Sequence, residues 1–168
     1  YTLDPSDLLT GGKTFGALAK TDYDSADASW GANAALAGQI RSNTFWLVQA
    51  GVRNGHDIDN RGDVGGYGPK RSQPSPEDYD QQSFLMKLQQ RVEGGHRFGL
   101  TGEYFKRRAD IDNMYDQGAG TSYLYGENST KKETERERVS FDYSYKAPGE
   151  GSLIDTATAV VYWPVSYT

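Results

Sequence analysis

The chain has no cysteine, and no run of apolar residues approaches the roughly 18 that a membrane-spanning helix needs. The lack of cysteine argues against a disulfide-stapled secreted module. The lack of a long apolar run excludes a helical membrane protein. Among the 168 residues, 18 Lys and Arg stand against 23 Asp and Glu, for a net charge of -5. With no net basic surface to neutralise phosphates, we expect no nucleic-acid partner.

Motifs that carry catalysis or bind metal are also missing. The two histidines, His56 and His96, lie far apart in the sequence, and there is no nucleophile elbow or obvious pair of acids. An Asp-Ile-Asp-Asn phrase occurs at 57–60 and again at 110–113. Neither copy has the ligand at the fifth position or the glutamate at the twelfth that a calcium hand requires. We therefore predict no enzyme, no intrinsic cofactor and no metal site.

An alternation of apolar and polar residues is the strongest positive signal. Val139, Phe141, Tyr143 and Tyr145 interleave with charged and small polar residues. Successive side chains of a strand point to opposite faces, so this segment has one aromatic face and one ionic face. Comparable segments of about ten residues or more recur, whereas a strand of a soluble protein is typically about five to six residues. Strands of about nine to eleven residues are typical of a tilted bilayer crossing.

The pattern predicts seven long strands, at about 13–22, 29–40, 44–54, 82–92, 96–108, 135–147 and 152–163. Compact turns at 41–43, 93–95 and 147–151 alternate with long polar stretches at 55–81 and 109–134. Outer-membrane barrels have this asymmetry, with short periplasmic turns and long extracellular loops. Seven strands do not make an even-stranded bacterial barrel, and the sequence from Tyr1 does not open with the basic-then-apolar signal segment of an exported precursor, so we expect a fragment. We expect an all-β fold that forms part of a larger transmembrane antiparallel β-barrel.

The ionic residues predict which face of each strand meets lipid, because a basic residue on the lipid face costs about 2–4 kcal/mol near the midplane. The predicted lipid-facing sets are Trp30, Ala32, Ala34, Leu36; Trp46, Val48, Ala50, Val52; Phe84, Met86, Leu88; and Phe98, Leu100, Tyr104. The run 131–138 mixes acidic and basic residues, and it predicts a tall hairpin that continues the wall above the membrane. Its odd positions lead into the lipid-facing series, and its even positions lead into the inward series. The last strand is apolar on both faces and stays ambiguous.

Four local phrases carry a family resemblance, and their order and spacing are more specific than any one of them. They lie at 4–9, 21–30, 51–55 and 73–80, the last running into Ser83-Phe84-Leu85-Met86-Lys87-Leu88. Together they resemble the haem and haemoglobin branch of the TonB-dependent outer-membrane receptors. The resemblance implies the early part of a 22-stranded barrel over 1–168, with the plug domain, the TonB box and the rest of the barrel outside this segment. The family phrase that accompanies its haem-binding histidine is absent too, so no family ligand residue can be placed on this chain.

The resemblance implies a receptor in the outer membrane of a Gram-negative bacterium, in contact with lipid and lipopolysaccharide. It would transport haem, free or taken from haemoglobin or another haem protein, with energy from the TonB complex acting on the absent N-terminal region. Our candidate ligand-binding residues are loop side chains: His56, Tyr67, Tyr79, Tyr115, Tyr123 and Tyr125. For His56 we favour an ordinary polar loop histidine, because no second candidate ligand stands beside it, and the tyrosines could equally pack the loops against each other. A siderophore receptor, a soluble secreted β-sandwich that binds glycans or protein, and a small porin or adhesin barrel are the alternatives.

Overall fold

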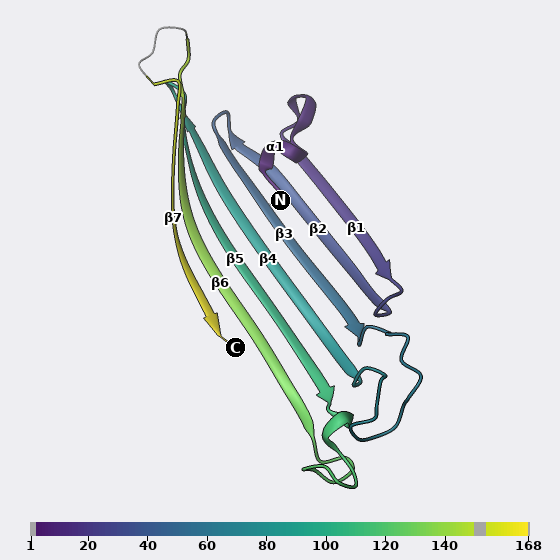
Figure 1. The fold of residues 1–168 in the computed structure, drawn as a ribbon. Helices are drawn as coiled ribbons and strands as arrows, with labels where there is room; N and C mark the ends of the chain where they lie inside the picture. Colours follow the sequence, from purple (N-terminus) through teal and green to yellow (C-terminus); the bar gives the residue numbers. More distant parts are fainter. Residues whose placement is uncertain (1–2, 150–153, 168) are drawn as a thin grey trace.

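Seven antiparallel strands lie side by side in chain order and form a single sheet (Figure 1). The computed structural model describes residues 3–149 and 154–167. The strands are β1 (Phe15–Asp24), β2 (Ser29–Arg41), β3 (Thr44–His56), β4 (Glu77–Val92), β5 (His96–Asp112), β6 (Ser129–Lys146) and β7 (Thr156–Tyr167). The predicted all-β antiparallel fold is confirmed. Within the described residues β1 and β7 do not pair with each other, so the sheet is open and its closure into a barrel stays a prediction.

All seven predicted strands exist, but four of them extend further into the polar stretches than we expected. β3 continues to His56 and β5 to Asp112, while β4 begins at Glu77 and β6 at Ser129. The predicted loops 55–81 and 109–134 are therefore too long, and the connections are 57–76 and 113–128. Cross-strand ion pairs explain the extension, since Lys106 Nζ lies 2.7 Å from Glu133 and 2.9 Å from Glu135. Opposite charges facing each other stabilise a ladder that has no apolar face.

The other boundaries differ by only a few residues. The first strand is shifted, starting at Phe15 where we predicted 13. The last strand begins at Thr156, later than the predicted 152, and residues 150–153 of the predicted turn and strand lie outside the described residues. In the turn between β4 and β5, Gly94 and Gly95 have φ of +85° and +84°, a backbone conformation that glycine adopts without strain. This turn matches the prediction.

The register of the strands gives the sheet one apolar face. Trp46 pairs with Leu88, Leu88 with Leu100 and Leu100 with Phe141. The next row runs from Leu36 through Val48 to Met86. All four predicted lipid-facing sets lie on this one face, which we call the apolar face. The register also assigns the two faces of the last strand, which the sequence left ambiguous. Val161 pairs with Phe141 and Trp163 with Val139, so Val161 and Trp163 lie on the apolar face.

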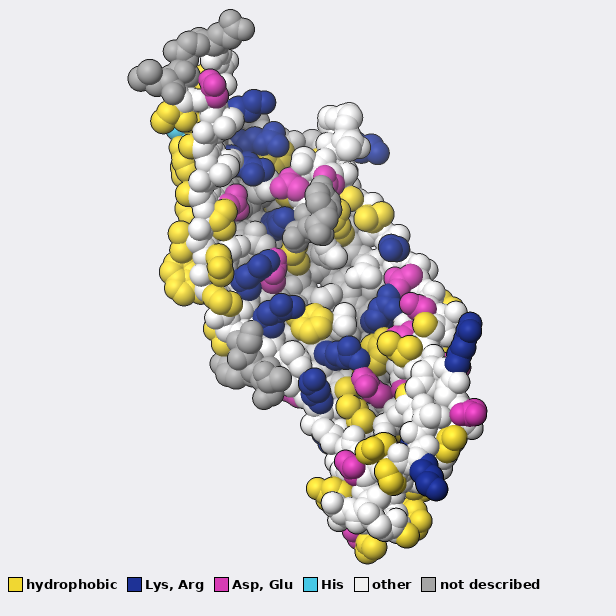
Figure 2. All heavy atoms as spheres, viewed as in Figure 1, with side chains coloured by type: hydrophobic (Ala, Val, Ile, Leu, Met, Phe, Trp, Pro, Cys, Tyr) yellow, Lys and Arg dark blue, Asp and Glu magenta, His cyan; other side chains and the backbone are white. Residues whose placement is uncertain are grey.

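The opposite, polar face carries the ionic side chains and the N-terminal segment. A four-residue helix, α1 (Pro5–Leu8), is closed by a capping box between Asp4 and Asp7 and is followed by a 3₁₀ turn, η1 (Thr10–Gly12). Leu3, Leu8 and Leu9 pack on the buried side chains Ala37, Leu47 and Leu85 of β2–β4. We did not expect this helix from the sequence. The space-filling view from this side shows Lys and Arg side chains gathered over the left half of the sheet (Figure 2).

Within the described residues, none of the helices is long and apolar enough to span a membrane.

Candidate ligand-binding face

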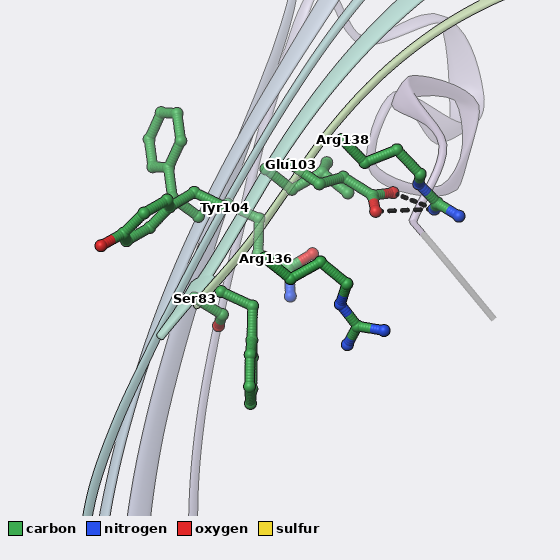
Figure 3. A pocket seen from close by; sticks show the side chains of 9 residues that line it. Ser83, Glu103, Tyr104, Arg136 and Arg138 are labelled. Carbon is green, nitrogen blue, oxygen red and sulfur yellow. Dashed lines mark hydrogen bonds and ion pairs between the residues drawn. The ribbon is translucent and has the colours of Figure 1, made fainter. Parts of the chain in front are cut away.

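A hollow of about 350 Å³ lies on the polar face where β3–β6 run side by side (Figure 3). Gln49, Ser83, Glu103, Arg136 and Arg138 contribute polar groups to its lining. Figure 3 shows the Glu103, Arg136 and Arg138 side chains on one side of the sheet and Tyr104 on the other, as the alternation of a strand requires. Arg138 donates to the Glu103 carboxylate at 2.6 Å, so this pair is neutral overall.

A second hollow of about 320 Å³ shares Phe105 with the first, so the two are neighbours along β5 and β6. Glu77, Arg107, Lys132 and Thr134 line it together with apolar side chains. Arg107 Nη2 lies 2.8 Å from Glu77, and its guanidinium lies 4.2 Å from the centre of the Tyr79 ring. The glutamate therefore balances the charge of Arg107.

Two basic side chains in these hollows have no acidic partner among the residues that the structure describes. They are Arg136, whose guanidinium lies 5.5 Å from the centre of the Phe105 ring, and Lys132. Both are exposed even positions of β6, as the alternation of the 131–138 run predicted. The basic side chains of the polar face of β4–β6 are Lys87, Arg91, Arg97, Arg107, Lys132, Arg136, Arg138 and Lys146, and the acidic ones are Glu77, Glu103 and Asp142. This face is therefore positive although the chain as a whole is negative.

His56 is the last residue of β3 and is exposed at the loop-bearing end of the sheet. Its Nδ1 lies 2.6 Å from the Asp78 carboxylate on β4, which is its partner in the strand register. His56 has the same parity as Trp46, Val48 and Val52, so it belongs to the apolar side of the sheet. The two hollows open on the other side. The structure thus does not bring His56 together with the cationic groups of the polar face.

Tyr79 holds the β1–β2 turn against β4. Its hydroxyl donates to Asp27 Oδ2 at 2.7 Å, and Gly55 opposite it leaves room for the ring. This hydrogen bond, together with those from Ser29, lowers the pKa of the Asp27 carboxyl below its usual 3.8. Tyr79 is therefore occupied by two structural contacts, the carboxylate of Asp27 and the guanidinium of Arg107.

The four other candidate tyrosines lie in the two long connections. Tyr67 and Tyr125 make an edge-on ring contact with centroids 5.0 Å apart, and Gly68 N donates to Met114 O at 2.9 Å. These contacts join connection 57–76 to connection 113–128. Tyr115 and Tyr123 are about half exposed, at 51% and 47%. The structure therefore brings Tyr67 and Tyr125 together, and all four tyrosines stay accessible to a partner.

Gln117 organises connection 113–128, and sequence reasoning missed it. It is fully buried, and its Nε2 donates to Asp112 Oδ1 at 2.6 Å and to Asn128 O at 3.0 Å. Its Oε1 accepts from the backbone N–H of Gly126. A single glutamine in a polar loop gives no sequence signal, because its importance comes from the backbone groups that fold around it.

Chemically, the polar face offers guanidinium, ammonium, hydroxyl and amide groups around Phe105, which suits recognition of an anion. Among the described residues there is no group of three or more His, Cys, Asp or Glu that could hold a metal ion. Neither a scan against protein-family models nor a search of curated proteins finds a match to this chain.

Proposed function

We propose that this sheet is part of the wall of a transmembrane β-barrel in the outer membrane of a Gram-negative bacterium. On this proposal the apolar face meets lipid, the polar face lines the lumen, and connections 57–76 and 113–128 face the outside. The complete protein would be a TonB-dependent receptor that takes up haem, free or from a haem protein. The chain performs no covalent chemistry in this proposal.

The observation that carries the barrel proposal is the uncharged band on the apolar face. On β4 the band runs from Phe84 to Val92, eight residue steps or about 27 Å at 3.4 Å per step. The apolar band of an outer-membrane barrel is about 25 Å tall. On β5 and β6 the charged side chains of this face begin in the edge row of the band, where Glu137 pairs with Tyr104 opposite Phe84, and continue beyond it with the Lys106–Glu135 pair. A second sheet, which a β-sandwich would need to cover such a face, is absent from the described residues.

The haem part of the proposal rests on the sequence resemblance, and the positive polar face agrees with it. Haem carries two propionate carboxylates, and a basic wall attracts anions into the space that it encloses. Many siderophores are anionic as well, so charge does not separate these two ligand classes. The ligand has to be identified by titration.

The experiment is a titration of the intact receptor with haem, followed by the Soret band, beside a version in which residues 57–76 are replaced by a short Gly-Ser turn. We expect binding by the parent, and weaker binding by the loop variant if connection 57–76 contributes to capture. A matched variant shortens connection 113–128 in the same way. Absence of a Soret change in the parent would refute haem as the ligand and leave the siderophore alternative.

A separate measurement tests the barrel. The 168-residue chain is expressed alone and examined by size-exclusion chromatography with and without detergent. We expect it to aggregate in buffer, because its apolar face and two unpaired sheet edges are uncovered. A monodisperse, folded species in plain buffer would refute the barrel and favour the soluble binding module.

A further inference from the structure

Arg136 and Lys132 project from one face of β6, four residues apart, which is about 14 Å along a strand. Thr134 lies between them with the same parity, and Phe105 on β5 pairs with Arg136 in the register. We call Arg136, Lys132, Thr134 and Phe105 the β6 strip. The long side chains of Arg and Lys can converge over Thr134, so the strip presents two cations, a hydroxyl and an aromatic ring to one ligand.

The cations of the strip differ from the neighbouring ones in having no acidic partner among the described residues. Arg138 is neutralised by Glu103 at 2.6 Å and Arg107 by Glu77 at 2.8 Å. On the apolar side of the same strands, Lys106 and Arg108 are likewise paired with glutamates. A basic side chain that pairs with nothing in its own sheet is free to bind an anion from outside. The strip thus carries positive charge that no acidic side chain of the described residues offsets.

We propose that the β6 strip binds the carboxylates of a ligand that carries a ferric centre, with Arg136 and Lys132 as the two charge partners. The inference rests on the proposed function in that the polar face lines the lumen. Arg136 presents a planar fork that matches a carboxylate, and Lys132 supplies a point charge. Phe105 supports a flat ligand body beside Arg136. Haem and ferric citrate both carry carboxylates around iron, and the test separates them.

The test uses the intact receptor in detergent and three probes: haem, haem dimethyl ester and ferric citrate. The variant is Arg136→Gln with Lys132→Gln. The matched control is Arg108→Gln with Lys131→Gln, which removes two charges from the other side of the same hairpin, where Lys131 is 88% exposed. Thermal unfolding of each variant checks that the fold is intact.

We expect the strip variant to bind haem or ferric citrate about tenfold more weakly or worse, because charge-assisted hydrogen bonds to carboxylate are lost. The control should bind like the parent. Haem dimethyl ester, which has no free carboxylate, should bind parent and strip variant equally.

The outcomes separate this inference from the proposed function. Haem binding that the strip variant leaves unchanged would uphold the function and overturn the strip, including the case in which an acidic protein segment covers it. Strip-dependent binding of ferric citrate without haem binding would uphold the strip and overturn the haem function. Binding of neither probe would overturn both.

Discussion

Replacing Val139 by arginine tests the orientation of the sheet most directly. Val139 lies on the apolar face of β6, 51% exposed, between Gly102 on β5 and Trp163 on β7. The adjacent residue Ser140 lies on the polar face at the same height. Val139→Arg and Ser140→Arg therefore place the same side chain on the same strand at the same depth, on opposite sides of the sheet.

The expected cost follows from the solvent on each side. Arginine on the lipid face near the bilayer midplane costs about 2–4 kcal/mol, and the cost falls to about 0–1 near the interface. Val139 lies in the row of Met86, between the band-edge row of Phe84 and the central row of Leu88, so we expect a cost of about 1–3 kcal/mol. At 1.4 kcal/mol per factor of ten, this cost shifts the folding equilibrium by about 5-fold to 140-fold. Ser140→Arg faces the polar interior and should cost under about 1 kcal/mol. Gln82→Arg, on the apolar face in the row of Lys106, should also cost at most about 1 kcal/mol.

The assay is urea unfolding of the intact receptor folded into phospholipid vesicles, followed by tryptophan fluorescence and by gel mobility without heating. We expect Val139→Arg to be much worse than Gln82→Arg, with Ser140→Arg nearly neutral. Equal costs for Val139→Arg and Ser140→Arg would refute the assignment of the two faces. A neutral Val139→Arg would show that this face meets water.

Three further predictions concern the packing of the sheet and its loops. Leu47→Ala should lower the free energy of unfolding by about 2–5 kcal/mol in denaturant titrations because the fully buried side chain leaves a cavity, whereas Ala at Leu124, 68% exposed, should change it little. Gln117→Ala should speed limited proteolysis of connection 113–128, at a cost of about 1–3 kcal/mol per unsatisfied buried group, and an unchanged cleavage rate would contradict its organising role. The lowered pKa of Asp27 adds stability that is present above its unfolded value near 3.8 and is lost as pH falls through the lower folded value, so Tyr79→Phe should flatten the pH dependence of unfolding below about pH 4, and parallel profiles would argue against this linkage.

The sequence predicted the sheet well because a two-residue period is visible along each strand. The apolar positions of β3 and β4 were assigned to one face from alternation alone, and the register confirms them. Alternation also predicted that Lys132 and Arg136 share a face with the inward series. What it could not show is which of these cations is paired, because a partner such as Glu103 for Arg138 depends on the register of two strands.

The misses have a common physical cause. The extension of β5 and β6 depends on ion pairs such as Lys106–Glu133, which join residues far apart in the chain, and no local pattern reports them. The packing of Leu8 on the cluster of Ala37, Leu47 and Leu85 is likewise a contact between distant segments. Gln117 belongs to the same class. His56 was proposed from its imidazole and its place at the start of a long loop, and only the register shows that it belongs to the apolar side with Asp78 as its partner.

The length of the β5–β6 hairpin has a consequence for where a partner is first met. From Tyr104 at the edge of the uncharged band to Asp112 at the end of β5 there are eight residue steps, or about 27 Å. Over this length β5 and β6 are paired and are joined by ion pairs. On the proposed orientation, this paired stretch is a rigid extension of the barrel wall above the membrane. It carries the half-exposed Tyr115 and Tyr123 away from the bilayer surface. The tip of the β5–β6 hairpin could then contact a bulky host protein before that protein reaches the membrane.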